Sequence, residues 1–129
     1  MPPTTHFILY VTDQRRAESF YTAVLDLRPR LDVPGMTEYD LPGGGVLGLM
    51  PEAGIRRLLG PELADPASAA GVARAELYLH VADAASYHRR AVERGARELS
   101  PMLPRSWGHQ VAYSQDPHGH VLAFADLAP

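Results

Sequence analysis

Trp107 is the residue of this chain whose chemistry is best suited to holding a ligand. It is the only tryptophan, and it lies in PRSWGHQ directly before Gly108. The adjacent glycine favours a loop, and a tryptophan outside a regular element either fills a core or offers a flat apolar surface to a ligand. We favour the ligand role. Further side chains can extend this apolar wall, although each taken singly is as readily a core residue: Tyr10, Tyr78, Tyr113, Met36 and Met50.

Glu76 also stands out, because it is a carboxylate that opens an otherwise apolar strand. Burying a charged carboxylate costs free energy unless the group finds a donor. Glu76 therefore lies either near the rim of the protein or in a pair, with His6 as a candidate partner. A paired Glu76 would orient a ligand or act as a base, and a surface position is the alternative.

His118 and His120 form a His-x-His pair, a spacing that can chelate a metal ion. They fall in DPHGH, whose residues are typical of a tight turn, so we expect a solvated turn here.

Other catalytic templates are absent from the sequence. The glycines at 43–45 join two strands instead of opening a helix as a phosphate loop does, and there is no Gly-x-Ser-x-Gly nucleophile turn.

Composition narrows the class of protein. The 129 residues, 46% hydrophobic and 21% charged, suit one globular domain with a core. The absence of cysteine excludes disulfides, thiol catalysis and cysteine-rich zinc sites, and a net charge of -3 with scattered arginines argues against nucleic-acid binding. No apolar run approaches the roughly 20 residues that span a bilayer, and MPPTTHF lacks a secretion signal. We expect a cytoplasmic protein with a small, partly apolar partner.

Several of these candidate residues lie in segments of the sequence that occur twice. HFILYVTD at 6–13 returns as ELYLHVAD at 76–83, an offset of 70 residues, and VLGL at 46–49 returns as VLAF at 121–124. Two modules of about 60 residues in one chain of this length must share a core or a cleft. The repeat therefore predicts that function lies between two related modules.

The first half is predicted to form a strand, a helix, a short strand and a hairpin. Residues 6–11 alternate as a strand, Asp13 stands at a helix N-cap, and a short strand around 28–33 precedes a hairpin of 35–41 and 46–50. The inward helix residues are expected to be Ala17, Phe20, Tyr21, Val24 and Leu25.

The second half follows the same βαβββ order, after a linker over 51–74 with one short helical piece at 55–59. A strand at 76–81 precedes a helix over 84–94, which Asp83 caps and Gly95 ends. Its inward residues are expected to be Tyr87, Ala91 and Val92, and the remaining strands are expected near 97–103, 109–114 and 121–125.

Alternation along the strands separates two faces. One face is uniformly apolar, as packing against a helix requires: Phe7, Leu9, Val11, Leu47 and Leu49, with Leu77, Leu79, Val81, Leu122 and Phe124 in the copy. The opposite face mixes polar, aromatic and small residues: His6, Ile8, Tyr10, Val46, Gly48 and Met50, with Glu76, Tyr78, His80, Val121, Ala123 and Ala125. Two such sheets would enclose a cleft lined by the mixed faces.

The chain resembles the vicinal oxygen chelate superfamily of glyoxalases, bleomycin resistance proteins and extradiol dioxygenases. The resemblance lies in HFILYVTD, FYTAVLDL, ELYLHVAD and DPHGHVLAF, and it covers nearly the whole chain. It implies an α+β fold of two tandem βαβββ modules, whose curved mixed sheets surround a cleft and carry helices on the outer face. It also implies a single domain over 1–129, made of module 1 (about 4–50), the linker (about 51–74) and module 2 (about 75–127).

The same resemblance gives a test for a metal. Metal-dependent members place ligands at the first residue of each repeated strand and a glutamate on the last strand of a module, which correspond to His6, Gly48, Glu76 and Ala123 here. Gly48 and Ala123 have no donor, whereas catalytic metals usually hold three or more protein ligands. Completing a set would require another residue, with His80, His109 and Glu38 as candidates. We therefore expect no metal or other cofactor; a divalent ion held by His6 and Glu76 is the alternative.

Two functions follow from the resemblance. We favour a metal-free protein, without a catalytic residue, that sequesters a bulky, partly aromatic natural product or drug as the bleomycin-resistance branch does. The alternative is a metal-dependent lyase, isomerase or dioxygenase that uses His6 and Glu76. Small members commonly pair, so a homodimer is expected. The predicted ligand-binding residues are Trp107, Tyr10, His6, Glu76, Tyr78, Met50, His109, Tyr113 and Met36.

Overall fold

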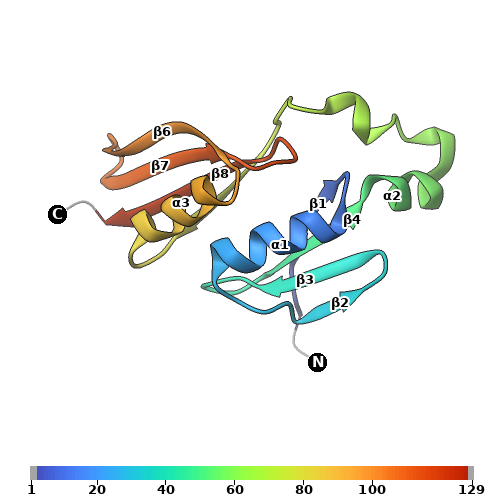
Figure 1. Cartoon of the computed structure of the whole chain (residues 1–129), viewed down its shortest axis with the longest axis horizontal. Coiled ribbons are helices and arrows are strands. Elements are labelled where there is room, and N and C mark those ends of the chain that lie inside the picture. The colour runs from blue at the N-terminus through green and yellow to red at the C-terminus, as the bar shows by residue number, and fades with distance from the viewer. Residues whose placement is uncertain (1–2, 128–129) are drawn as a thin grey trace. The chain divides into compact units, whose positions relative to one another are not determined.

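Each half of the repeat folds into its own unit in the computed structural model, which describes residues 3–127. The first unit comprises the described residues up to 22 together with 26–70, and the second comprises 23–25 and the described residues from 71 onward. Each unit contains one four-stranded sheet (Figure 1). Below, module 1 denotes the described residues up to 70 and module 2 the described residues from 71 onward.

Module 1 follows the predicted order of elements. Its elements are β1 (His6–Val11), α1 (Gln14–Leu25), β2 (Leu31–Val33), β3 (Met36–Asp40) and β4 (Val46–Pro51). The strands lie in the order β1-β4-β3-β2, with β1 parallel to β4 and the other pairs antiparallel. The sheet is therefore mixed, as the resemblance implies.

The helix α1 begins where Asp13 predicts, because the Asp13 carboxylate accepts a hydrogen bond from the Arg16 backbone N–H at 3.0 Å. Tyr39 on β3 ties the helix to the sheet: its hydroxyl lies 2.8 Å from Thr22 Oγ1 and donates to the Glu18 carbonyl at 3.0 Å. Burial raises the pKa of the Tyr39 hydroxyl to about 12. The residues predicted to point inward are all buried: Ala17, Phe20, Tyr21, Val24 and Leu25.

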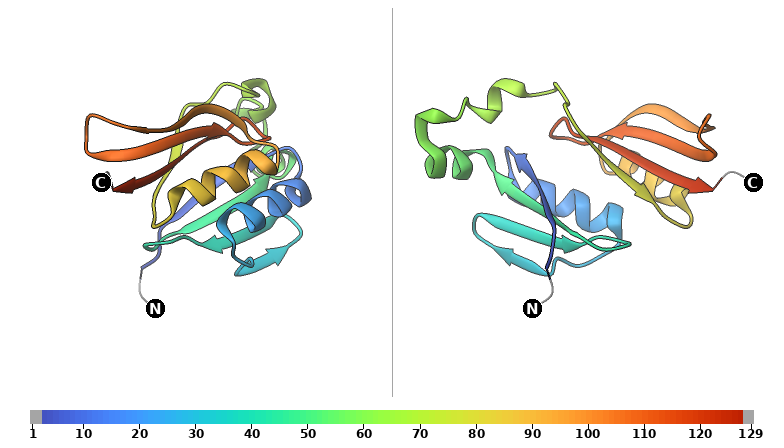
Figure 2. Two further views of the ribbon diagram at one scale, coloured as in Figure 1. Left: turned by 60° about the vertical axis from the view of Figure 1, so that its left-hand side comes forward. Right: turned by 180° about the vertical axis from the view of Figure 1, so that it is seen from behind.

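Module 2 repeats this topology and confirms the prediction of tandem βαβββ modules. Its elements are β5 (Glu76–His80), α3 (Ala84–Glu93), β6 (Arg97–Pro104), β7 (His109–Gln115) and β8 (Val121–Leu127). The strand order is β5-β8-β7-β6, with β5 parallel to β8. The helix α3 covers one face of this sheet (Figure 2). The Tyr87 ring of α3 lies 5.8 Å from the Phe124 ring of β8 between centroids.

The start of α3 differs from the predicted cap. Asp83 precedes the helix, but its backbone is left-handed, with φ of 60°. Its carboxylate accepts a hydrogen bond from the Ser86 hydroxyl at 2.7 Å and none from a backbone N–H of the helix. Asp83 therefore marks the position of the helix start without capping its backbone in the way that Asp13 does.

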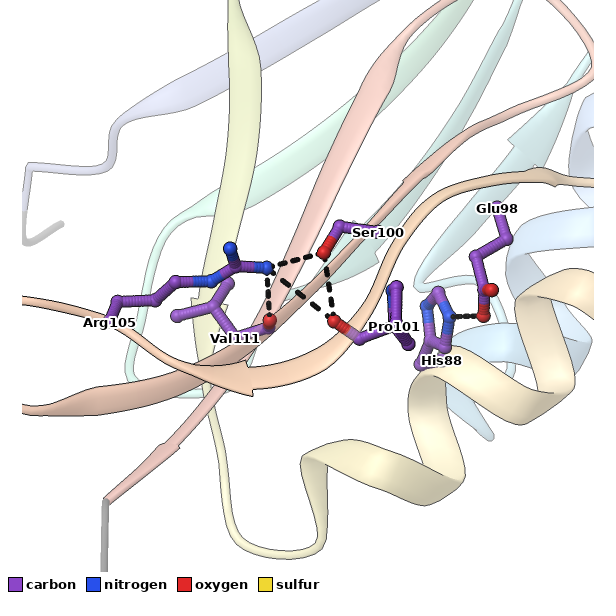
Figure 3. A network of polar contacts seen from close by, with 6 residues as sticks. All are labelled: His88, Glu98, Ser100, Pro101, Arg105 and Val111. Carbon is purple, nitrogen blue, oxygen red and sulfur yellow. Dashed lines mark hydrogen bonds and ion pairs between the residues drawn. The ribbon is translucent and has the colours of Figure 1, made fainter.

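The buried side of α3 also differs from prediction at one residue. Val92 was expected to point inward and is 40% exposed, whereas His88 is buried beside Ala84 and Ala91. A buried imidazole needs a polar partner, and His88 Nε2 lies 2.8 Å from the Glu98 carboxylate on β6 (Figure 3). Polar pairing thus allows a histidine to take the place that a purely apolar pattern assigns to valine.

The linker has more secondary structure than its composition predicts. It forms α2 (Glu52–Leu59) and two short 3-10 helices, η1 (Gly60–Glu62) and η2 (Pro66–Ala69). Neither α2 nor any other helix within residues 3–127 is long and apolar enough to cross a membrane.

The last part of the linker is held at the turn between β7 and β8. A Cβ atom at Gly119 would lie 3.0 Å from the backbone nitrogen of Gly71, and Gly119 itself has φ of +94°. Gln115 Nε2 reaches both sides of this contact, at 3.0 Å from the Gly119 carbonyl and 3.5 Å from the Gly71 carbonyl. Only glycine at position 119 allows so close an approach of the two backbones.

The predicted faces of the strands hold in the interior of each sheet. The buried helix-facing residues are Leu9, Val11, Leu47, Leu49, Leu79, Leu122 and Phe124. Phe7 departs from the prediction and is 44% exposed. It lies near the start of β1, whereas Leu9 and Val11 farther along the same strand are buried. Leu77, at the matching position of β5, is half-buried, whereas Leu79 on the same strand is buried.

Candidate functional site

The face of the module 2 sheet that points away from α3 has a floor of small side chains. Strand register places six residues on this face: Tyr78, Ala123 and Tyr113 in one row, and His80, Ala125 and Val111 in the next. Val111, Ala123 and Ala125 are fully buried, and Tyr113 packs against them. Because these three small residues are fully covered, the accessible surface of this face belongs to the larger side chains around them.

Four of those neighbours form a connected aromatic cluster, which consists of Trp107, Tyr78, His109 and His80. Trp107 Nε1 donates to the Tyr78 hydroxyl oxygen at 3.0 Å, and that oxygen lies 2.5 Å from His109 Nδ1. The His109 ring stacks on the His80 ring with 4.3 Å between centroids. Trp107 remains 54% exposed. Hydrogen bonds thus orient the rings while a large flat surface stays open to a ligand.

Arg105 supports the edge of this face. Its guanidinium donates to Ser100 Oγ at 2.6 Å and to the Val111 carbonyl at 2.9 Å (Figure 3). The same group lies over the Tyr113 ring, 5.1 Å from the centroid, where a cation is attracted to the ring face. One side chain therefore connects β6, β7 and an aromatic residue of the candidate site.

The backbone of Arg105 also closes the turn that carries Trp107. The Arg105 N–H donates to the His109 carbonyl at 2.8 Å, and the Gly108 N–H donates to the Arg105 carbonyl at 3.2 Å. Sequence reasoning missed Arg105. The available signal was its position in PRSWGHQ, two residues before Trp107.

Tyr113 and Glu76 influence each other electrostatically. Burial raises the pKa of the Tyr113 hydroxyl, the negative charge of Glu76 raises it further, and the Arg105 guanidinium lowers it. Glu76 is exposed at the start of β5, in keeping with the rim position that the sequence left open.

The equivalent face of module 1 is built differently. Register places Gly48 between Ile8 on β1 and Glu38 on β3. A Cβ atom at Gly48 would lie 3.0 Å from Ile8 Cγ1 and 3.1 Å from Met36 Sδ, so two apolar side chains close over this position. The centre of this face is apolar.

His6 finds its carboxylate partner within module 1. Its Nδ1 lies 3.5 Å from a Glu38 carboxylate oxygen, and Arg30 Nε lies 3.8 Å from the other. The Glu38 side chain is only 14% exposed, so two basic groups compensate a largely buried charge. Within module 1, Glu38 is therefore the carboxylate that pairs with His6, whereas the pairing of His6 with Glu76 that the sequence suggested stays a prediction.

The nine predicted ligand-binding residues divide between the two modules. Five belong to the face of module 2 or its bordering turn: Glu76, Tyr78, Trp107, His109 and Tyr113. Four lie on the equivalent face of module 1: His6, Tyr10, Met36 and Met50. That both groups line a single cleft remains a prediction.

The positions that correspond to the superfamily's metal ligands do not fit a metal ion. Gly48 and Ala123 carry no donor, and Ile8 and Met36 crowd the space at Gly48. Within residues 3–127, no three His, Asp or Glu side chains gather closely enough to hold a metal ion. Of the additional candidates, Glu38 is engaged by His6 and Arg30, and His109 Nδ1 by Tyr78.

The His-x-His pair lies in the predicted turn. The Asp116 carboxylate accepts hydrogen bonds from the backbone N–H groups of His118 and His120, each at 2.8 Å. Both histidines are half-buried, so the turn is less solvated than expected. The fold therefore uses Asp116 and the backbone of this segment to close a hairpin.

A groove of about 590 Å³ lies elsewhere in module 1, against the linker. Five of its seven lining residues have polar or charged side chains and none is aromatic: Thr12, Glu52, Ala53, Arg56, Arg57, Asp65 and Ala67. An ion pair between Arg56 and Asp65 at 3.0 Å crosses part of the lining. The groove therefore lacks the flat apolar surface that the module 2 face offers.

A family model described as the glyoxalase/bleomycin resistance protein/dioxygenase superfamily matches residues 4–124. The chain belongs to this superfamily. None of the curated proteins searched matches the sequence.

Solved structures of the superfamily share the fold at low sequence identity. A glyoxalase-related enzyme from Fulvimarina pelagi matches with a TM-score of 0.79 and 20% identity, covering 98% of this chain and 88% of that one. A superfamily enzyme from Burkholderia phytofirmans PsJN matches with a TM-score of 0.80 and 15% identity, covering 96% and 98%. TioX from Micromonospora sp. ML1 matches with a TM-score of 0.68 and 20% identity, covering 98% and 100%. At these identities the likeness shows the fold alone.

Proposed function

We propose that this protein binds a bulky, partly aromatic small molecule and sequesters it without a metal ion and without catalysing a reaction. The aromatic cluster beside the floor of Val111, Ala123 and Ala125 carries the proposal. Sequestration requires a flat apolar surface and a few oriented polar groups, and this face offers both. The same superfamily suggests a natural product or drug as the ligand, and antibiotic resistance in the cytoplasm as the role.

The test is a titration with a panel of aromatic natural products, in which tryptophan emission monitors binding. Trp107 is the only tryptophan of the chain, so any change in emission reports on the candidate site. We expect a saturable change with at least one compound. The same titration with Leu58→Ala should give an unchanged affinity, because Leu58 is 71% exposed on α2 and outside this face. A panel without any saturable change would contradict the proposal.

A metal-dependent lyase, isomerase or dioxygenase that uses His6 and Glu76 is the second candidate, and Glu38, whose carboxylate lies 3.5 Å from His6 Nδ1, is a further potential ligand. Elemental analysis after exposure to iron, zinc, manganese and nickel separates the two functions. The binding proposal predicts no stoichiometric ion. A tightly held ion that His6→Ala removes would favour the enzyme instead.

We also propose that the protein is a homodimer. Large apolar side chains on the faces and edges of the strands are exposed in the single chain, among them Phe7, Ile8, Leu31 and Val33. Exposed apolar patches of this kind often mark an interface. Sedimentation at micromolar concentration should show a dimer, and a monomer would remove the proposal.

A further inference from the structure

The hydrogen bonds of the aromatic cluster have a direction. An indole N–H can only donate, so the Tyr78 oxygen accepts from Trp107 Nε1. The Tyr78 proton is then directed to its second neighbour, His109 Nδ1, at 2.5 Å. In the reverse arrangement both neighbours would donate to the same oxygen, and the Tyr78 proton would lose its protein acceptor. Trp107 thus favours the arrangement in which His109 Nδ1 accepts.

This direction determines which nitrogen of His109 carries the proton. A neutral imidazole has one donor nitrogen and one acceptor nitrogen, so an accepting Nδ1 places the proton on Nε2. Within residues 3–127, His109 makes its side-chain hydrogen bond through Nδ1, and its ring stacks on His80. The Nε2–H is therefore a donor that finds no acceptor among the described residues 3–127, on a half-buried ring beside the exposed Trp107.

We propose that His109 Nε2–H selects the ligand: the site takes planar aromatic compounds that carry a hydrogen-bond acceptor on the ring system, such as a ring carbonyl. This inference rests on the proposed binding function and names its ligand class. An acceptor pairs with the Nε2–H while the rings of the ligand lie against Trp107 and Tyr78. A compound of the same shape without the acceptor leaves this donor unpaired when it displaces water, which costs affinity.

The first experiment needs no ligand. Long-range ¹H–¹⁵N spectra at about pH 8.5, well above the ordinary histidine pKa of ~6.5, report which imidazole nitrogen is protonated. His109→Asn assigns the signal among the six histidines. We expect the proton on Nε2, and a shift of the Nδ1 resonance in Tyr78→Phe, which lacks the hydroxyl. A proton on Nδ1 in the wild type, or an unmoved Nδ1 resonance in Tyr78→Phe, would overturn the assignment.

The second experiment compares two compounds by calorimetry: 9-fluorenone-2-carboxylate and fluorene-2-carboxylate. They share a planar frame and a carboxylate and differ by the ring carbonyl. We expect the fluorenone to bind roughly 3- to 10-fold more tightly, the range for one net hydrogen bond. His109→Phe should remove this preference while keeping an aromatic ring. The control Leu58→Ala should keep the preference, because Leu58 is exposed on α2 and lies outside this face.

The outcomes separate the two proposals. Equal binding of both compounds to the wild type would refute the acceptor preference and leave the binding function standing. Failure of both compounds to bind would refute this ligand class. Together with an unresponsive natural-product panel, that result would refute the binding function as well.

Discussion

The two sheets have the same topology, yet their open faces have diverged. In module 1 the central position is Gly48, which Ile8 and Met36 close, beside a carboxylate paired with His6. In module 2 the matching position is Ala123, part of a small-residue floor next to hydrogen-bonded aromatic rings. The helix-facing sides remain alike, because each must bury an apolar surface. The comparison shows that packing preserves one face of a repeated sheet, whereas the other face is free to acquire a site.

The largest expected effect tests the face that the modules share. Leu47→Ala and Leu122→Ala each truncate a fully buried side chain at matching positions of the repeat. Each should lower the free energy of unfolding by about 2–5 kcal/mol, through lost burial and a residual cavity. Urea unfolding followed by circular dichroism measures both. A loss below about 1 kcal/mol in either variant would show that the two helix-facing sides are not equivalent.

The next effect tests the face that differs. Trp107→Ala should weaken binding of an aromatic ligand about 30-fold, the equivalent of about 2 kcal/mol for a tryptophan at the centre of a binding surface. Calorimetry is the measurement, since the variant has no tryptophan emission. Thermal stability should change little because Trp107 is 54% exposed. A loss of stability as large as the loss of affinity would identify Trp107 as a structural residue instead.

Alkaline pH distinguishes a tyrosine on each face. The folded state holds the pKa of Tyr39 at about 12, above the value near 10 in the unfolded chain, so between these pH values the unfolded state binds fewer protons. Stability from Tyr39 is therefore complete below about pH 10 and falls by up to about 1.4 kcal/mol per pH unit until about pH 12. The chain has no lysine or cysteine, so tyrosines dominate titration in this window.

Tyr39→Phe should flatten this dependence in urea unfolding series between pH 9 and about 12. Tyr113→Phe is the matched control. The pKa of Tyr113 is also raised, so its removal changes the dependence in the same direction, by less. An identical pH profile for wild type and Tyr39→Phe would contradict the expectation.

The smallest effect tests the closed centre of module 1. Gly48→Ala places a methyl group 3.0 Å from Ile8 Cγ1 and 3.1 Å from Met36 Sδ. Because the methionine is flexible, we expect a loss of only about 1 kcal/mol in urea unfolding. The loss should shrink in a Met36→Ala background, where space is available. An equal loss in both backgrounds would place the cause in the backbone of β4.

Much of the fold could be predicted from local patterns. Alternation predicted the buried positions Leu9, Leu47 and Leu122, and residue type predicted the cap at Asp13. Both signals depend on a few neighbouring residues. The strand alternation also occurs in both copies of the repeat, which strengthens the prediction. Phe7 and Val92 failed because burial also depends on which elements flank a residue. Asp83 failed because its capping role depends on a backbone angle that the residue type does not determine.

The candidate site could be predicted only as a set of residue types. Trp107, Tyr78 and His109 were named from the sequence, but the order of their hydrogen bonds depends on the β6–β7 turn. Arg105 was missed because its partners include main-chain carbonyls, which carry no signature in the sequence. The pair of His6 with Glu38 likewise depends on strand order, which brings β1 and β3 to opposite sides of β4.

The contact between Gly119 and Gly71 has a practical consequence for protein engineering. Chimeras that exchange second modules between related proteins need a cutting point, and the repeat in the sequence suggests the start of β5. Gly71 touches the β7–β8 turn, however, and shares the Gln115 side chain with it. A graft that begins at β5 would leave half of this glycine contact behind. A cut before Gly71, after η2, transfers both glycines together and keeps the donor turn matched to its own incoming backbone.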